Sequence, residues 1–553
     1  MIPALFKTIK ESPKSLSGKA LASDVIAGII VAIVALPLSI ALAISSGVSP
    51  EKGLITAIIA GFLISFLGGS RVQIGGPTAA FVVIICGIIE EFGLDGLIIA
   101  TILAGIFLII FGLLKLGSVI KFVPYPITVG FTAGIAITLF STQLNDFLGL
   151  NLDGVPSEFL SKWAVYIQNF DKINWYAVVI GVACVAVIMI WDRMNKKIPG
   201  SLIALVLSTV AVMLFDIPVE TIDSKFGEIP SGLPMPTIPA FDFSKVGALI
   251  QPAVTIAVLA RVESLLSAVV ADGMTGQKHD SNMELVAQGA ANIGSALFGG
   301  LPATGAIART AANINNGGRT PIAGIVHAIT ILIVLLVAMP LAKLIPMCTL
   351  AAILIVVAYN MSGIEAFKGV MKSTKSDMVV LILTFLLTVI FDLVVAIEVG
   401  MILAVFLFMK KASDNFSSYL HPDAPDEVPV EELSNEVVVY EIDGPLFFGT
   451  ATMFMDKLSS VSKDSDIVIM RMKRVQFIDA TALDSLRKMI ERARKHHIML
   501  MFSEVNETVM NTMRKSGLVD ELGEDRFFAT ITAASDEAKN IVDIKHKMAD
   551  RRK

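Results

Sequence analysis

The sequence predicts an α-helical membrane protein that crosses the bilayer many times and ends in a small soluble α/β domain. Two observations support this fold class. Of the 553 residues, 54% are hydrophobic and only 17% are charged, whereas soluble domains average about 25% charged residues. The apolar runs also stop at Lys410 and Lys411, after which polar and charged residues dominate. The formal net charge of −5 gives no reason to expect a nucleic-acid partner.

The membrane domain is expected at residues 24–411, after a basic amphipathic segment at 1–23. An acidic, proline-rich loop at 216–246 divides the domain into two halves with seven apolar runs each. The runs lie at about 24–45, 53–68, 75–89, 93–114, 120–143, 174–191, 198–215, 247–271, 284–298, 303–314, 319–341, 343–361, 376–391 and 393–410. We therefore expect about fourteen spans.

The charges of the connecting loops predict the orientation of these spans. Basic residues follow the sixth and the twelfth runs, at Arg193, Lys196, Lys197, Lys368, Lys372 and Lys375. The positive-inside rule places these loops and the N-terminus in the cytoplasm. Seven spans in each half would invert the second half relative to the first, as in inverted-repeat transporters. We expect a multi-pass protein of the plasma (inner) membrane, with the soluble domain also cytoplasmic.

Two stretches interrupt the apolar pattern at membrane depth, Gly68–Phe81 and Gly299–Pro321. Both follow a Phe/Leu-Gly-Gly ending, and the second carries Arg309 and three asparagines. Irregular backbone is tolerated at this depth only where it is buried in protein or lines a watery cavity. We expect a half-helix at Thr304–Ala312, whose N-terminus would favour an anion. The alternative is that both stretches are re-entrant packing loops that use glycine for close helix contact.

A second intramembrane charge is Glu263, which lies four residues before Ser267 and so shares a helix face with it. Three roles are open for Glu263: a proton carrier, a cation ligand, or the counter-charge of Arg309. An anion would compete with Glu263 for positive potential, so anion binding and protonation of Glu263 should favour each other. Thr78, which follows Pro77, is expected either to cap the first half-helix or to donate to an oxyanion.

Four motifs resemble the sulfate permease (SulP) family, whose animal relatives form solute carrier family 26. They are ALPLSIALAISSGV at 35–48, IGGPTAAFVV at 74–83, ESLLSAVVADGMTG at 263–276, and the 299–321 stretch. The resemblance implies a seven-plus-seven inverted repeat with core and gate domains, an elevator-like mechanism, and a C-terminal STAS domain. We also expect a homodimer.

The resemblance places an anion site between the third and tenth helices. Carried over, the site comprises Thr78, Ala79, Ala80, Phe81, Ile307, Ala308 and Arg309, with Leu38 and Leu42 as an apolar wall. Some family members have a serine where this chain has Ala308 and a polar residue where it has Leu38, so backbone N–H groups are expected to bind more of the anion. Sodium-coupled bicarbonate members have Asp and Thr at the positions of Glu263 and Ser267. They also have a hydroxyl-bearing residue at the position of Ile307, so this chain favours proton coupling.

The sequence therefore predicts a secondary active transporter that imports sulfate or a similar oxyanion with protons. A sodium-coupled bicarbonate or dicarboxylate transporter is the alternative within transport, and a passive anion channel or STAS-linked sensor is the alternative of another class. Walker A, catalytic-triad and metal-ligand patterns are absent from the sequence, so we expect neither an enzyme nor a cofactor.

The C-terminal region is expected to contain a linker at 412–435, the STAS domain at 436–540 and a basic tail at 541–553. Strands are predicted at 437–442, 467–470 and 498–502, and helices at 480–496 and 507–516. The STAS resemblance rests on PLFFG at 445–449 and FIDATALDSL at 477–486. Phosphorylated relatives carry serine at the position of Thr481, which is either a regulatory site or the cap of the helix that begins there.

Overall fold

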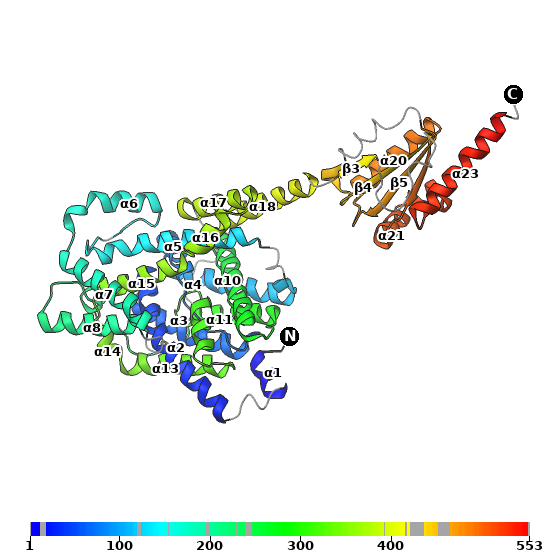
Figure 1. Cartoon of the computed structure of the whole chain (residues 1–553). Coiled ribbons are helices and arrows are strands. Elements are labelled where there is room, and N and C mark those ends of the chain that lie inside the picture. The colour runs from blue at the N-terminus through cyan, green and yellow to red at the C-terminus, as the bar shows by residue number, and fades with distance from the viewer. Residues whose placement is uncertain are drawn as a thin grey trace. The chain divides into compact units, whose positions relative to one another are not determined.

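The computed structural model divides the chain into two units, Met1–Ile402 and Leu403–Lys553 (Figure 1). It describes residues 2–11, 18–118, 123–152, 154–194, 199–227, 230–237, 246–391, 393–414, 417–420, 436–451 and 465–550. The basic loop residues Lys196 and Lys197 and the greater part of the predicted linker at 412–435 lie outside these ranges.

The described residues of the first unit form mainly helices, of which the last, α18, continues into the second unit (Figure 1). They are α1 (Ala4–Glu11), α2 (Gly18–Ser45), α3 (Pro50–Leu67), η2 (Ala79–Phe81), α4 (Val82–Leu113), α5 (Tyr125–Phe147), α6 (Phe159–Gln168), η4 (Phe170–Lys172), α7 (Trp175–Met194), α8 (Gly200–Phe215), α9 (Ile222–Phe226), α10 (Val246–Thr275), α11 (Ser281–Leu297), α12 (Ile307–Asn315), α13 (Ile322–Val337), α14 (Met339–Ala342), α15 (Met347–Met361), α16 (Ile364–Met371), α17 (Lys375–Ile390) and α18 (Leu393–Asp414). Two short strands, β1 (Gly75–Gly76) and β2 (Thr304–Gly305), interrupt the helical pattern.

Six helical segments in the described ranges are long and apolar enough to cross a membrane: Gly18–Ser45, Pro50–Leu67, Ala79–Leu113, Tyr125–Phe147, Val246–Thr275 and Met347–Met371. Shorter apolar helices occur at Trp175–Trp191, Gly200–Phe215 and Ile322–Val337. Gly93, with φ 70° and ψ −175°, breaks α4 where the second of the two apolar runs predicted there begins. The count of fourteen spans and the seven-plus-seven repeat stay predictions.

Helices from the two halves of the sequence pack against each other. α4 packs on α10 and α11, and α5 packs on α15 and α17. α4 and α11 approach closely at a glycine pair, because a Cβ on Gly105 would lie 2.6 Å from the carbonyl oxygen of Gly289. Glycine at such a crossing allows backbones to approach, which stabilises packing between apolar helices.

The second unit contains a five-stranded sheet in the order β3-β4-β5-β6-β7. Its strands are β3 (Ser417–Leu420), β4 (Val437–Asp443), β5 (Ile467–Arg474), β6 (Met499–Ser503) and β7 (Phe527–Phe528), and its helices are α20 (Ala480–Lys495), α21 (Glu507–Lys515), α22 (Leu518–Leu522), η7 (Glu524–Arg526) and α23 (Ile531–Asp550). β3 pairs antiparallel to β4, and the other pairs are parallel.

The apolar side chains of β5 point alternately to the two faces of this sheet, and each face is covered by helices. Val468 and Met470 pack in the core with α20, α21 and α22, whereas Ile467 and Ile469 pack with α23. Successive side chains of a strand point to opposite faces, so both faces are apolar and both are covered. The predicted strands β4, β5 and β6 and helices α20 and α21 are confirmed.

Three details of this region differ from the sequence prediction. β3 lies inside the predicted linker, since its four residues are too few to show a strand pattern before they pair with β4. The helix α23 runs through Asp550, into the predicted tail at 541–553. Thr481 is not the cap of α20, because Asp479 precedes it and accepts a hydrogen bond from the Ala482 N–H. Thr481 is exposed in the first turn, so its regulatory role stays a prediction.

Candidate functional site

The two interrupted stretches meet in a short antiparallel crossing. Gly75 of β1 pairs with Gly305 of β2, and Gly76 pairs with Thr304. The crossing is extended by the Ala306 N–H, which donates to the Ile74 carbonyl over 2.9 Å. Beyond the crossing, β1 leads through η2 into α4, and β2 leads into α12. The two helix starts are therefore held together by main-chain pairing.

The second half-helix begins later than the sequence predicts. It spans Ile307–Asn315 rather than Thr304–Ala312, because Thr304 and Gly305 are extended and paired with β1. Its N-cap residue, Ala306, has no side chain that can accept from the first turn. Unsatisfied N–H groups at such a start are suited to an anion.

Buried side chains from neighbouring helices satisfy the irregular backbone around the crossing. Asn313 Nδ2 of α12 donates to the Val72 carbonyl over 2.8 Å, and Asn292 Nδ2 of α11 donates to the Ala303 carbonyl over 2.8 Å. The Ala303 N–H in turn donates to Asn292 Oδ1 over 2.9 Å. Because unsatisfied backbone groups in hydrocarbon are costly, these bonds explain how an irregular segment persists inside an apolar helix bundle.

Arg309 is only 3% exposed and points back towards the start of the first half-helix. Its Nη2 atom lies 3.3 Å from Ser39 Oγ and 3.2 Å from the Pro77 carbonyl oxygen, and donates to both. In the part of the chain that the structure describes, Nη1 has no hydrogen-bond partner. A buried guanidinium with free donor capacity is a strong attractant for an anion.

Glu263 and Thr78 are joined by a side-chain hydrogen bond. Thr78 Oγ1 donates to Glu263 Oε2 over 2.8 Å, and the Thr78 side chain does not cap η2. Across the described residues, no Glu263–Arg309 ion pair is recorded, so the counter-charge role finds no support in the contacts. The cap role predicted for Thr78 is wrong, because its hydroxyl is directed to the carboxylate.

Ser267 is fully buried and takes part in a bridge between the two stretches. Its Oγ donates to Thr310 Oγ1 over 3.2 Å, and the same Thr310 oxygen accepts from the Ile74 N–H over 3.1 Å. Sequence reasoning missed Thr310 and Ser39. Thr310 directly follows Arg309, and Ser39 lies inside the motif at 35–48. Neither residue is charged, so the search for charges inside the apolar region did not identify them.

The other predicted residues divide by exposure. Ala79, Ala80, Phe81 and Leu42 are buried, Leu38 is half-buried, and Ile307 and Ala308 are exposed. Phe81 is 0% exposed, so it packs in the core beneath the helix start. Ala80 also lines a cavity of about 560 Å³, together with residues of α4, α5, α10 and α17. The first half-helix therefore starts beside a large cavity.

Comparison with known proteins identifies this arrangement. Residues 21–384 match the Sulfate permease family, and residues 429–534 match the STAS domain. The chain belongs to the sulfate permease family. It is therefore a member of a family of membrane-embedded anion transporters rather than enzymes, as the four motifs indicated.

Curated relatives cover nearly the whole chain. A putative sulfate transporter of Bacillus subtilis, YvdB, is 42% identical over 507 residues, which are 91% of this chain and 95% of that protein. A bicarbonate transporter of Picosynechococcus, BicA, is 32% identical over 494 residues, which are 85% of this chain and 86% of that protein. The sulfate permease family thus includes relatives named for different anions.

Solved structures share the fold. The structure of SLC26A9 superposes with a TM-score of 0.86 at 18% identity, covering 98% of this chain and 94% of that chain. The transmembrane domain of a cyanobacterial BicA superposes with a TM-score of 0.61 at 31% identity, covering 69% of this chain and 97% of that chain. These likenesses show a helical transporter fold with a C-terminal STAS domain.

Proposed function

We propose that this member of the sulfate permease family is a secondary active transporter that takes up sulfate or a similar oxyanion with protons. The observation that carries the proposal is the Thr78–Glu263 hydrogen bond beside the crossing. It places a carboxylate that can gain a proton in contact with a hydroxyl at the start of the first half-helix. Binding and protonation can then share one group.

The anion would lie between the starts of η2 and α12. Arg309 supplies positive charge, and the exposed first turn of α12 at Ile307 and Ala308 supplies N–H groups. Ala308 and Leu38 offer no polar side-chain atoms, so the main chain provides most of the direct contacts. Main-chain donors suit many oxyanions, which fits a family with relatives named for different substrates.

Coupling follows from competition for the Thr78 hydroxyl proton. While Glu263 is ionised, it accepts this hydrogen bond and adds negative charge near the anion. Once Glu263 is protonated, the charge is gone and the Thr78 hydroxyl is free to donate to the oxyanion. Each event favours the other by linkage, which gives symport without a metal ion.

A sodium-coupled bicarbonate transporter is the second candidate, favoured by the BicA relative. In this chain the Ser267 hydroxyl donates to Thr310, and the Ile307 side chain contains no oxygen atom. Fewer side-chain oxygen atoms are therefore available to bind sodium than in a site rich in hydroxyl groups. Proton coupling is therefore the preferred proposal.

Uptake into proteoliposomes tests the proposal. Labelled sulfate, bicarbonate and fumarate are offered under an imposed proton or sodium gradient. Glu263→Gln imitates the protonated carboxyl, so it should still exchange sulfate but no longer accumulate it on a proton gradient. Glu91→Gln, a carboxylate on the cavity wall, is the matched control and should accumulate sulfate normally.

Two results would contradict this proposal. Accumulation by Glu263→Gln on a proton gradient would leave Glu263 a structural residue. Accumulation by the unmodified protein that requires sodium and ignores pH would support the second candidate instead.

We also propose an oligomeric state, a membrane orientation and a transport motion for this protein, on the basis of its family membership and loop charges. We expect a homodimer in the plasma membrane with the N-terminus and the STAS domain in the cytoplasm. The helices that carry the site would move as one body past the others in an elevator-like step. The orientation is testable by labelling single cysteines introduced at Lys172 and Lys368, which should react from opposite sides of the membrane.

A further inference from the structure

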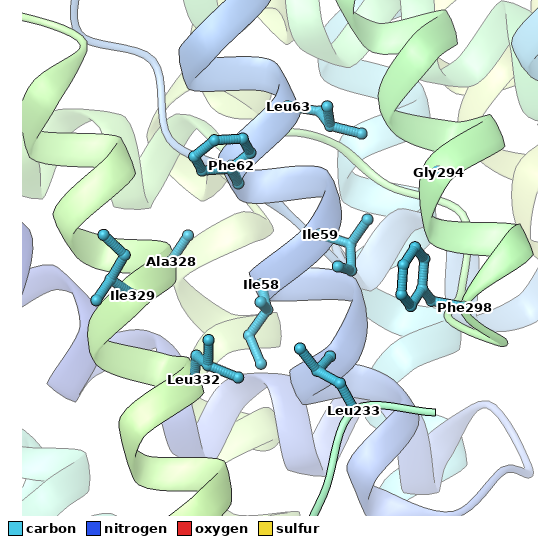
Figure 2. Close-up of a pocket in the computed structure, with 10 residues that line it drawn as sticks. All are labelled: Ile58, Ile59, Phe62, Leu63, Leu233, Gly294, Phe298, Ala328, Ile329 and Leu332. Atoms are coloured by element: carbon cyan, nitrogen blue, oxygen red, sulfur yellow. The ribbon is translucent and has the colours of Figure 1, made fainter. Parts of the chain in front are cut away.

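A wholly apolar pocket lies along α3. Figure 2 shows its ten lining residues converging from α3, α11, α13 and the segment that carries Leu233. The residues are Ile58, Ile59, Phe62, Leu63, Leu233, Gly294, Phe298, Ala328, Ile329 and Leu332. The pocket has a volume of about 400 Å³. All of its lining residues are apolar or glycine, so water finds no polar partner there.

Two observations indicate that this pocket opens towards hydrocarbon. Phe62 is 37% exposed and Ile329 is 48% exposed, and both line the pocket. The exposed stripe continues along α13 through Ile333 and Leu336, which are 56% and 53% exposed. These positions are spaced three or four residues apart, so they form one face of a membrane helix. Such a face is stable in contact with acyl chains.

Lys52 places a positive charge at one end of the pocket. It lies in the first turn of α3, seven residues before Ile59 and therefore on the same helix face. Its Nζ donates to the Gly299 carbonyl over 3.2 Å, and Gly299 directly follows Phe298 of the lining. An ammonium has three N–H donors, and in the described residues no carboxylate is recorded within ion-pair distance of Lys52. Lysines at the ends of membrane helices commonly lie at the level of lipid phosphates.

We propose that this pocket is a binding site for one anionic phospholipid, with an acyl chain between α3, α11 and α13 and the phosphate at Lys52. An apolar chain and a negative group joined end to end match the two features of the site. A second copy of the chain could fill the apolar part, but it would need an acidic group to meet Lys52. The proposal does not depend on the transported anion or on its coupling ion.

A bound phospholipid would also brace the stretch that leads to β2. α3 holds that stretch through Lys52 at Gly299 and through Thr56, whose Oγ1 accepts from the Leu301 N–H over 2.7 Å. A ligand that binds only the folded state raises its stability. Phosphatidylglycerol should therefore raise the thermal midpoint of the delipidated protein.

Native mass spectrometry of the full-length, delipidated protein tests the site. Phosphatidylglycerol and phosphatidylcholine are titrated separately, with glycerophosphate as a headgroup without chains. The unmodified protein should retain one phosphatidylglycerol tightly and prefer it to phosphatidylcholine by about fivefold, the effect of roughly one lysine near a phosphate. Glycerophosphate alone should not bind measurably.

Two variants separate the parts of the site. Ile329→Trp fills the pocket and should weaken both phospholipids, whereas Val182→Trp, at an exposed apolar position of α7, should not. Lys52→Met should abolish the preference for phosphatidylglycerol but retain phosphatidylcholine, whereas Lys172→Met should change neither. Size-exclusion profiles and thermal midpoints confirm that each variant is folded.

The inference is overturned if folded Ile329→Trp and Lys52→Met bind phosphatidylglycerol like the unmodified protein. It is also overturned if Ile329→Trp converts a dimer to a monomer without changing lipid retention, since the pocket would then be an interface between copies. Tight binding of glycerophosphate that Lys52→Met abolishes would indicate an anion site without a chain pocket.

Discussion

The two arms of the crossing have similar sequences but different surroundings. The arm from β1 into η2 starts its helix with buried Ala79 and Ala80, and its polar atom is the Thr78 hydroxyl, bonded to Glu263. The arm from β2 into α12 starts with exposed Ile307 and Ala308.

Their charges differ as well. The second arm carries Arg309, which is turned back to contact the Pro77 carbonyl of the first arm. In the proposed mechanism, one arm would supply positive charge and open N–H groups, and the other would supply the link to a proton. The difference between the arms suggests how a paired backbone motif would divide binding and coupling between its two copies.

The largest expected effect is that of Arg309→Ala. Removing a charged donor from the anion should weaken binding by about 1.5–3 kcal/mol, roughly 10- to 150-fold. Arg319→Ala is the matched control, because Arg319 Nη1 donates to the Ile314 and Gly318 carbonyls at the far end of the same arm. Isothermal titration with sulfate distinguishes the two. Unchanged affinity in folded Arg309→Ala would remove the proposed division of roles.

The next largest effects are expected from adding one methyl group to a glycine of each arm, by Gly76→Ala in the first arm and Gly305→Ala in the second. A Cβ on Gly76, whose φ is 153°, would lie 2.5 Å from Arg309 Nη1, so Gly76→Ala should displace the guanidinium and lower sulfate affinity several-fold. A Cβ on Gly305 would lie 1.4 Å from Gln73 Nε2. Gly305→Ala should therefore mainly destabilise the fold, by about 1–3 kcal/mol. Affinity and thermal midpoint are measured for both, and equal losses of affinity in variants of equal stability would contradict the comparison.

Thr78→Val tests whether the hydroxyl of the first arm is shared between Glu263 and the anion. It removes the hydroxyl but keeps the side-chain volume, so sulfate affinity should fall by about fivefold, the value of a typical hydrogen bond. The pH dependence of binding should also weaken, because Glu263 and the anion no longer share a donor. Thr78→Ser should behave like the unmodified protein. Binding measured across a pH series checks this, and an unaltered pH profile in Thr78→Val would oppose the shared-donor mechanism.

Ser267→Ala tests the bridge that joins the arms to α10. It removes the donor to Thr310, so stability should fall by about 1 kcal/mol and sulfate affinity should change little. Thermal unfolding in one detergent measures the first quantity. A large loss of affinity without a loss of stability would mean that Ser267 contacts the ligand.

Removal of the STAS domain should have the smallest effect on the arms. Truncation after Asp414 keeps α18 and the whole crossing but removes β3 to α23. Sulfate affinity in detergent should stay the same, while uptake in cells is free to change if the STAS domain regulates transport. Loss of sulfate binding by a folded truncated protein would show that the arms depend on the STAS domain.

Much of the architecture could be predicted because it is encoded locally. The apolar runs, the composition change after Lys411, and the glycine-rich interruptions are visible in the sequence. Helical and strand periodicities need only neighbouring residues, so α20, α21 and β4 to β6 were predicted correctly. β3 was not, because a strand of four residues is defined by its partner.

Only the tertiary structure decided how the site is assembled. Thr78 and Glu263 are 185 residues apart, and Arg309 is 270 residues from Ser39. Which side chains meet depends on the register of Gly75 with Gly305 and on how α10 packs beside the crossing. The sequence by itself determined that the apolar region contains an arginine, a carboxylate and two interrupted helical runs. Their pairing is a property of packing between distant segments, and no local periodicity encodes it.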